Sequence, residues 1–325
     1  TVLTPTVVTG SNSNNKFYSN TIQNCNYGMA LIGFADVTPF ALADTGNDIG
    51  GISSGTGNTI VNYGGAAAAT NASAAIRTLA QYNINVSFNT INNNNGSGVN
   101  HVTTLRGIYL NTATSANAAI TNNTVTINGG ATTSQISVIE NVSGSTAASN
   151  TVVISNNVIS NSTYTTATSG AFYGIYNTAS AASVNISNNL FNGLNYSNSA
   201  IGGSGSVYTI YNTGATTTLS VISNTVTNCA FTGTTGATFG GIYASSGTNQ
   251  IITNNSINSC TISGTGTSGT IYGIRAAGTT VTISDNFVND LYNTKTTGTA
   301  AIYGIYDLSS PTNETYNNNK VFNLS

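Results

Sequence analysis

Two aspartates form the strongest candidate for metal chemistry in this chain. In the segment Asp44-Thr-Gly-Asn-Asp48 the two carboxylates could face one calcium ion, which prefers several oxygen ligands. The surrounding phrase Gly-Asn-Asp-Ile-Gly-Gly is also what a tight turn requires, because glycine and asparagine tolerate turn conformations. We therefore expect a structural turn at Asp44 and Asp48, and we expect no metal and no other cofactor.

Residues for catalysis are scattered along the sequence. His101 is the only histidine, and no serine or cysteine phrase accompanies it, so we expect it in a surface loop. No two of the eight acidic residues occupy equivalent positions in neighbouring repeats, which disfavours the paired carboxylates of a glycosidase. These observations predict that the protein is not an enzyme.

A row of tyrosine and charged residues is the most suggestive feature for binding. Each member follows the isoleucine, or the corresponding residue, of a phrase such as Tyr173-Gly-Ile-Tyr176. The row reads Arg77, Tyr109, Glu140, Tyr176, Tyr211, Tyr243, Arg275 and Tyr306. If the isoleucines point inward, strand alternation turns this row outward, where Tyr109, Tyr176, Tyr211, Tyr243, Arg275 and Tyr306 could bind sugars. The structural alternative is that stacked rings stabilise a sheet by about 0.2 to 1 kcal/mol per pair.

An asparagine that recurs every 31 to 38 residues shows what must position this row. It occurs at Asn20, Asn58, Asn89, Asn123, Asn157, Asn189, Asn224, Asn255, Asn286 and Asn319. The phrase around it recurs as well, for example from Val152 to Ile159 and from Val184 to Phe191. A fixed period with a fixed apolar pattern predicts one supersecondary unit stacked on copies of itself.

The apolar pattern around each asparagine predicts three short strands per repeat. The second residue after it is always apolar, and the third and fifth residues before it alternate with polar ones, as in a strand with one buried face. The Gly-Ile-Tyr phrases supply a third strand. We predict an all-β fold, a right-handed, three-sided parallel β-helix of about ten coils with roughly 33 residues each.

The recurring asparagine lies at the bend between two strands. Asparagine tolerates left-handed backbone conformations, and its amide both donates and accepts hydrogen bonds. An unbroken column of ten such residues predicts a ladder of stacked amides along the body.

One elongated domain is expected over residues 1–325. Residues 1–16 are expected to form an N-terminal strand or cap, while 34–46 and 64–75 are expected to be insertions. No amphipathic capping helix is evident near either end, although a solenoid terminus exposes strand edges and an open core.

The three cysteines fall at one position of the repeat, five residues after the asparagine. Cys229 and Cys260 would lie in adjacent coils, where the distance permits a disulfide but the parallel side chains give it poor geometry. Other coils place Leu194 and Leu291 at this position. We favour buried free thiols in a core column over a disulfide.

Composition excludes several classes of protein. Only 4% of residues are charged, and six cations cannot form the basic surface that nucleic acid requires. No apolar run approaches the roughly 18 residues of a spanning helix, so no membrane insertion is expected. The regularly spaced isoleucine, valine and tyrosine residues disfavour disorder.

The repeat resembles the right-handed parallel β-helix family, the architecture shared with pectate lyases, in which an asparagine ladder occupies one bend. The segments Gly46-Asn-Asp-Ile-Gly-Gly51 and Gly57-Asn-Thr-Ile-Val-Asn62 resemble phrases of large secreted bacterial surface proteins. The low-charge composition is similar to that of repetitive surface proteins of Bacteroidetes-type bacteria. This resemblance implies an extracellular or cell-surface location, and pectate lyases use the face of the tyrosine row for their substrate.

Three classes of function follow from the sequence. The prediction is a non-enzymatic structural or adhesive module, a solenoid segment of a surface protein, stalk or fibre. Its partners would be copies stacked end to end, further repeats of a longer chain, or glycans. The alternative is a carbohydrate-binding or polysaccharide-lyase-like β-helix that uses the tyrosine-lined face. A minor alternative is an ice-binding solenoid, because a row begins with Thr21, Thr59, Thr90 and Thr124, but Phe287 and Lys320 interrupt it.

Overall fold

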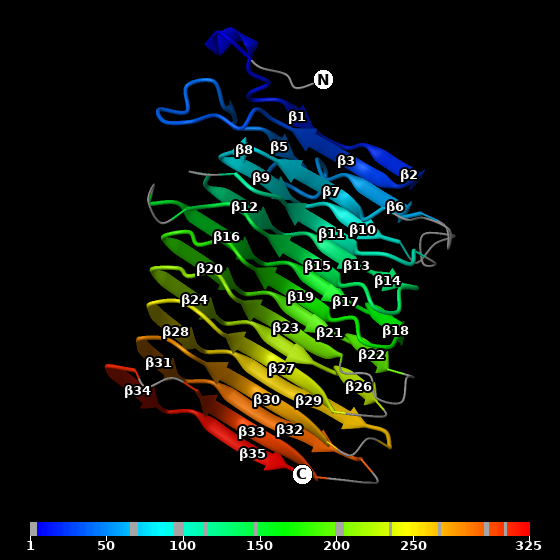
Figure 1. Cartoon of the computed structure of the whole chain (residues 1–325), viewed down its shortest axis with the longest axis vertical. Coiled ribbons are helices and arrows are strands. Elements are labelled where there is room, and N and C mark those ends of the chain that lie inside the picture. Colours follow the sequence, from blue (N-terminus) through cyan, green and yellow to red (C-terminus); the bar gives the residue numbers. More distant parts are fainter. Residues whose placement is uncertain are drawn as a thin grey trace.

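A computed structural model of the 325-residue chain is a parallel β-solenoid (Figure 1). It describes residues 5–65, 71–93, 101–113, 116–145, 149–198, 205–233, 236–265, 268–295, 299–308 and 311–325. Three large sheets run along the body, and every pair of neighbouring strands in them is parallel. Equivalent residues of neighbouring coils pair directly, as Val152 does with Val184, 32 positions later.

The strands of each coil fall in the same order on the three sheets. The ten-stranded sheet holds β1 (Lys16–Phe17), β5 (Asp48–Ile49), β9 (Ile84–Ser87), β12 (Ala118–Thr121), β16 (Thr151–Ser155), β20 (Ser183–Ser187), β24 (Thr218–Ile222), β28 (Asn249–Thr253), β31 (Thr280–Ser284) and β34 (Asn313–Asn317). The nine-stranded sheet holds β3 (Tyr27–Ile32), β7 (Ser73–Leu79), β11 (Leu105–Leu110), β15 (Ile136–Asn141), β19 (Phe172–Asn177), β23 (Ser206–Asn212), β27 (Ala237–Ala244), β30 (Ser268–Ala276) and β33 (Thr299–Asp307).

The fourteen-stranded sheet contains two rows of strands. The long row is β2 (Thr21–Cys25), β6 (Thr59–Tyr63), β10 (Thr90–Asn92), β13 (Thr124–Thr126), β17 (Val158–Ser160), β21 (Leu190–Asn192), β25 (Thr225–Thr227), β29 (Ser256–Ser263), β32 (Phe287–Asn293) and β35 (Lys320–Leu324). The short row is β14 (Asn128–Gly129), β18 (Thr163–Ala167), β22 (Asn195–Asn198) and β26 (Ala230–Gly233), and it joins the long row at β29. The sheets confirm the stacked coils and their expected spacing.

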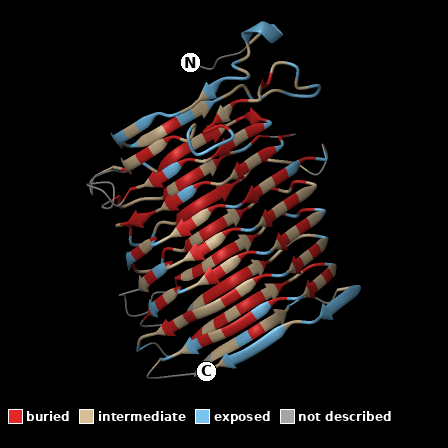
Figure 2. Ribbon diagram, turned by 180° about the vertical axis from the view of Figure 1, so that it is seen from behind, coloured by how far each residue is buried: buried red, intermediate tan, exposed pale blue. Residues whose placement is uncertain are grey.

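The core is the space between the sheets (Figure 2). The residue two positions after each ladder asparagine is buried in the interior coils, as Ile159 and Val226 are, with no exposed surface. In the interior coils the residue three positions before it is buried as well, with one exception. Gly55 is exposed, and Ile49 takes its place between Phe17 and Val86, because the turn Gly50–Gly57 is inserted in this coil.

The asparagine ladder is present at all ten expected positions. The backbone N–H and the Nδ2 of Asn123 both donate to Oδ1 of Asn157, each at 3.0 Å. Nδ2 of Asn157 then donates to Oδ1 of Asn189 and to the carbonyl of Ile120, both at 2.9 Å. The same pattern repeats from Asn20 to Asn319. Each interior amide therefore uses both of its donors and both acceptor positions of its oxygen.

The sequence pattern suggested that the ladder asparagine itself has a left-handed backbone. The structure shows that it does not. That conformation belongs to the residue before it in most coils. Examples are Asn122, Asn156, Asn188 and Asn254, with φ of 56° to 57°. The two neighbouring residues have separate roles: the left-handed residue turns the chain, and the asparagine after it directs its side chain inward to the ladder. Phe88 is the one bulky residue at this position among the described coils, with φ of 57°.

The N-terminal part of the chain departs from the regular pattern. Residues 1–4 lie outside the described residues, Val8–Gly10 form a 3-10 helix (η1), and the first strand begins only at Lys16. The backbone N–H of Asn12 donates to Asp44, which ties this segment to the insertion 34–46. That insertion ends in β4 (Asp44–Thr45), which pairs with β8 (Gln81–Tyr82). Within 64–75, residues 66–70 lie outside the described residues, and residues from Ser73 onward belong to the regular strand β7.

The ladder predicts a large loss of stability for Asn157→Leu. The substitution removes the acceptor of the backbone N–H of Asn123 and of one of its two Nδ2 hydrogens, both in a buried site, while the bond from Nδ2 to the carbonyl of Val86 remains. Unsatisfied buried groups cost about 1 to 3 kcal/mol each, so we expect a loss on the order of 3 kcal/mol. Urea unfolding followed by circular dichroism measures it.

The control is Asn195→Leu, because Asn195 is an exposed asparagine on β22 outside the ladder. It should change the midpoint of unfolding very little. Equal shifts for the two variants would contradict a stabilising role of the ladder.

Candidate functional site

The outer face of the nine-stranded sheet carries the row predicted from the sequence. Ile175, Ile210 and Ile242 are buried, and the tyrosine that follows each of them is half-buried and faces outward. The strand register aligns Tyr176, Tyr211 and Tyr243 directly, followed by Arg275 and Tyr306. The inward and outward assignments are therefore confirmed for these three coils, whereas Glu140 of the predicted row is buried.

A second outward row lies three residues before the first. It reads Tyr27, Ala74, Arg106, Ser137, Tyr173, Tyr208, Gly240, Tyr272 and Tyr303. Its tyrosines and Arg106 are at least partly exposed, whereas the small residues Ala74, Ser137 and Gly240 are buried. Strict alternation would turn residues three apart to opposite faces. Here the strands contain a local irregularity, in which Gly174 and Ile175 are both buried and the parallel pairing skips Gly174.

A glycine occupies the extra inward position in most coils, and Val138 and Thr209 occupy it in two others. A Cβ at Gly174 would lie 2.5 Å from the carbonyl oxygen of Thr209 in the next coil and 2.7 Å from the ring of Phe191. The glycines at 107, 241, 273 and 304 meet similar obstacles, so most coils use glycine there. The extra inward residue acts like a β-bulge and brings two outward side chains per coil onto one face.

The two rows meet as a continuous aromatic surface, which we call the tyrosine face. It consists of Tyr173, Tyr176, Tyr208, Tyr211, Tyr243, Tyr272, Tyr303 and Tyr306 with Arg275. The rings of Tyr176 and Tyr211 stack with centroids 5.4 Å apart and planes 9° apart. Tyr211 stacks in turn on Tyr243 at 5.0 Å. These distances are those of favourable ring pairs.

Arg275 continues the tyrosine face through cation–π contacts. Its guanidinium carbon lies 4.3 Å from the ring centroid of Tyr243 and 4.9 Å from that of Tyr272. The gap in the second row at Gly240 is closed by Tyr208, since a Cβ at Gly240 would lie 2.6 Å from that ring. The face thus has no break from Tyr173 to Tyr306.

Burial of these rings changes their acidity. Partial burial raises the pKa of Tyr208 to about 12, and it also raises the pKa of Tyr173 and Tyr211. Burial favours the neutral phenol because the phenolate loses hydration.

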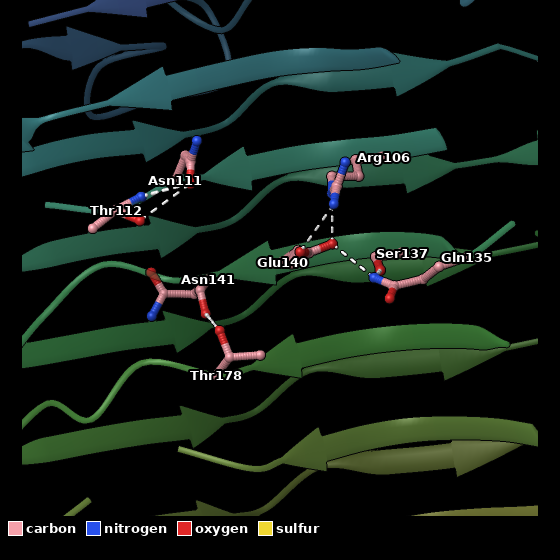
Figure 3. A network of polar contacts seen from close by, with 8 residues as sticks. All are labelled: Arg106, Asn111, Thr112, Gln135, Ser137, Glu140, Asn141 and Thr178. Atoms are coloured by element: carbon pink, nitrogen blue, oxygen red, sulfur yellow. Dashed lines mark hydrogen bonds and ion pairs between the residues drawn. The ribbon is translucent and has the colours of Figure 1, made fainter. Parts of the chain in front are cut away.

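Tyr109 does not join the tyrosine face, although it belongs to the predicted row. The coil between Tyr109 and Tyr176 carries Ser137 and Glu140, and Glu140 is buried. Arg106 pairs with Glu140 through Nε at 2.6 Å and Nη2 at 3.2 Å, and Gln135 donates to the same carboxylate (Figure 3). Tyr109 instead packs beneath Arg106, whose guanidinium carbon lies 4.1 Å from its ring centroid.

Asp44 and Asp48 are occupied by hydrogen bonds of their turns. Asp44 accepts the backbone N–H of Asn12 at 2.8 Å. Asp48 accepts the hydroxyl of Tyr18, the N–H of Gly51 and the amide of Asn85. Across the described residues there is no group of three or more His, Cys, Asp or Glu side chains that could hold a metal ion. This arrangement fits the structural interpretation of the segment.

The prediction that His101 is a surface loop residue is wrong. The side chain is fully buried, its Nδ1 accepts the N–H of Gly65 at 3.0 Å, and its Nε2 lies 2.8 Å from the hydroxyl of Thr103. Burial lowers the pKa of His101, which favours the neutral ring. Both ring nitrogens are thus engaged in holding neighbouring loops together.

The cysteines are core residues with free thiols, as predicted. Cys229 and Cys260 are buried, and Cys25 is half-buried in the first coil. Cys260 pairs in register with Leu291, so cysteine and leucine side chains share this core column. No disulfide is formed among the three.

Comparison with known proteins gives no relative for this chain. No family model, curated protein or solved structure matches it. The resemblance to pectate-lyase-like β-helices thus rests on the repeat phrases and the ladder. In the described part of the chain, no helix has the length and hydrophobicity that a membrane crossing requires.

The raised pKa of Tyr208 predicts a loss of stability at alkaline pH. An unfolded tyrosine ionises near pH 10, whereas Tyr208 in the folded chain keeps its proton to about pH 12. Between these two pH values the folded state binds more protons than the unfolded state, so the free energy of unfolding falls as pH rises. Below pH 10 the stabilising contribution of the neutral Tyr208 is fully present.

The measurement is the urea midpoint of the wild type and of Tyr208→Phe at several values between pH 9 and pH 12. The variant should lose less stability across this range than the wild type. Identical pH profiles would show that Tyr208 ionises in the folded protein as freely as in the unfolded chain.

Proposed function

We propose that this chain is a non-enzymatic structural and adhesive module of an extracellular or cell-surface protein. In this proposal the solenoid is a rigid rod, and the tyrosine face binds extended glycan chains. The observation that carries the proposal is the unbroken surface of eight tyrosines and Arg275, which crosses five consecutive coils on one side of the body.

The chemistry of this surface supports a sugar ligand. Half-buried aromatic rings offer large apolar area at low cost in side-chain entropy, and tyrosine adds a hydroxyl for hydrogen bonding. Neighbouring coils of a parallel stack repeat at about 4.8 Å, so the face presents a regular series of rings to a polymer. Because the rings stack on one another along the row, a sugar would contact their outer edges and hydroxyls.

The other candidate activities find less support. The acidic residues Asp44 and Asp48, which a lyase-like reaction would first involve, lie in hydrogen-bonded turns away from the tyrosine face. The threonine row that an ice-binding surface would need is interrupted by Val158, Leu190 and Phe287 in direct register. Adhesion through the tyrosine face is therefore the function that we propose.

The test is a glycan array followed by titration of the strongest ligand with wild type and with Tyr211→Ala. Tyr211 contacts the rings of four neighbouring tyrosines, so its loss interrupts the middle of the face. We expect binding at least ten times weaker. The matched control is Tyr292→Ala, an exposed tyrosine on the fourteen-stranded sheet, which should bind like the wild type.

Thermal unfolding of each variant establishes that it is folded. An array without any bound glycan, or equal affinities for Tyr211→Ala and wild type, would refute the proposed role of this face.

The polarity of the ladder favours a second candidate function, the assembly of coils into a longer rod. Every rung donates from the lower-numbered coil to the amide oxygen of the next one. Within the described residues, no donor meets Oδ1 of Asn20 and no acceptor meets the backbone N–H of Asn319. The edge at β35 also leaves Val321 41% exposed, whereas Val288 in the coil before it is fully buried. A second copy, or further repeats of a longer chain, would complete both the ladder and the core.

Sedimentation velocity at increasing concentration tests this assembly with the chain itself. We expect end-to-end association of the wild type and its loss in Val321→Lys, which places a charge in the junction. Thr165→Lys is the control, because Thr165 is exposed on the side of the rod, and it should associate like the wild type. A wild-type chain that stays monomeric at millimolar concentration contradicts self-assembly.

A further inference from the structure

A pocket of about 200 Å³ lies on the outer face of the nine-stranded sheet, beyond the end of the tyrosine face. Its walls come from three successive strands: Tyr27 on β3, Arg77 on β7, and Arg106 and Tyr109 on β11. The pocket exists because Ala74 takes the place of a large side chain in the second outward row, between Tyr27 and Arg106. Equivalent positions in later coils hold Tyr173 and Tyr208.

The two arginines of the pocket differ in how their charges are balanced. Arg106 is held by both oxygens of Glu140 and stacks on Tyr109, so its position is fixed and its charge is neutralised. Arg77 has a cation–π contact, with its guanidinium carbon 5.6 Å from the ring centroid of Tyr27. The Arg106–Glu140 pair is the one salt bridge recorded among the described residues, so Arg77 has no carboxylate partner there.

The Nε of Arg77 is buried and has no hydrogen-bond partner. A buried donor without an acceptor is unfavourable, and an anionic oxygen in the pocket would satisfy it with a charge-assisted hydrogen bond. Two arginines and one glutamate leave a local charge of one positive unit. That charge matches a monoanion such as a carboxylate better than a phosphate monoester, which carries nearly two negative charges.

We propose that this pocket binds the carboxylate of an acidic sugar, with Arg77 as the principal ligand and the rings of Tyr27 and Tyr109 as walls. The pocket is smaller than the roughly 300 to 1,000 Å³ of sites for drug-sized ligands, which suits one sugar ring. The hydroxyl of Tyr27 is already donated to the carbonyl of Ala72, so its ring is held in place. The coil of Ser137 and Glu140 separates this site from the tyrosine face, and the two proposals rest on different residues.

The three arginines of the chain make a direct test possible by NMR. Their Nε–H signals can be assigned by replacing one arginine at a time with lysine, and each signal can then be followed while glucuronate is added. We expect a saturable shift of the Arg77 signal and little change at Arg275. Glucose and the neutral glucuronamide should cause no saturable shift, and acetate, which has the carboxylate without the sugar ring, should bind at least ten times more weakly than glucuronate.

Two variants test the pocket itself, with the Arg106 signal as the reporter. Arg77→Gln removes the charge, and Ala74→Tyr fills the space with the side chain that later coils carry in this row, so the fold should tolerate it. Both should weaken glucuronate binding at least tenfold, while the control Lys16→Gln, which removes an exposed cation on the ten-stranded sheet, should leave it unchanged.

A failure of this proposal can be distinguished from a failure of the proposed role of the tyrosine face, because Tyr211→Ala should not alter glucuronate binding at Arg77. Equal affinity for glucose and glucuronate, or unchanged glucuronate binding in Arg77→Gln, would overturn the proposal. Equal affinity for acetate would also overturn it, since the site would then recognise a bare anion. If Arg77→Gln failed to fold, the comparison of glucuronate with glucuronamide on the wild type would still decide.

Discussion

In each interior rung of the ladder, one asparagine amide satisfies four hydrogen-bonding positions at once. Asn157 accepts two bonds from the coil before it and donates one bond to Asn189 and one to the carbonyl of Ile120. A side chain that lacked either the oxygen or the NH₂ group would leave partners unsatisfied on two neighbouring coils. The ladder therefore fixes the register of the stack at one corner. The loops elsewhere can differ in length, which explains gaps of 31 to 38 residues without any break in the sheets.

The rest of the coil is arranged around that fixed corner. The residue before the ladder asparagine adopts the left-handed conformation that turns the chain, and apolar residues on either side enter the core. A shorter ladder, in which Asn141 donates to Asn177 and Asn177 to Asn212, stabilises the turn that follows the nine-stranded sheet. Between these two corners lies the strand with the buried glycine and isoleucine. Its irregularity produces the two outward rows, so the candidate binding surfaces depend on a backbone feature rather than on the tyrosines alone.

The sequence was sufficient for the features that repeat in every coil. The ladder, the buried columns and the outward position of Tyr176 and Tyr211 all follow from periodicity, because each coil supplies an independent example of the same environment. Features that occur once could not be predicted in this way. His101 has no counterpart in other coils, so nothing in its sequence context indicated that Gly65 and Thr103 would bury it. The Arg106–Glu140 pair joins residues 34 positions apart, and only the strand register brings them together.

The second outward row was missed for a different reason. Its residues were visible in the Tyr-Gly-Ile-Tyr phrases, but strict alternation assigns the first tyrosine of each phrase to the inner face when the second faces outward. The recurring glycine indicates the extra buried position, because a Cβ at Gly174 would lie 2.5 Å from the carbonyl oxygen of Thr209 in the next coil. Val138 and Thr209 show that the position is also buried where it carries a side chain. A glycine that recurs inside a strand phrase indicates a bulge, and a bulge changes which residues share a face.

The outward rows vary where the core and the ladder do not. In the second row the same position holds tyrosine, arginine, serine, glycine or alanine in different coils, while the isoleucine nearby stays buried. Folding places little constraint on these positions, since the ladder and the core already fix the register. One replacement in a row, such as Ala74, opens a charged pocket, and a run of tyrosines builds a continuous face. The same scaffold can therefore present two chemically different surfaces along one sheet, each determined by side chains outside the ladder and the core.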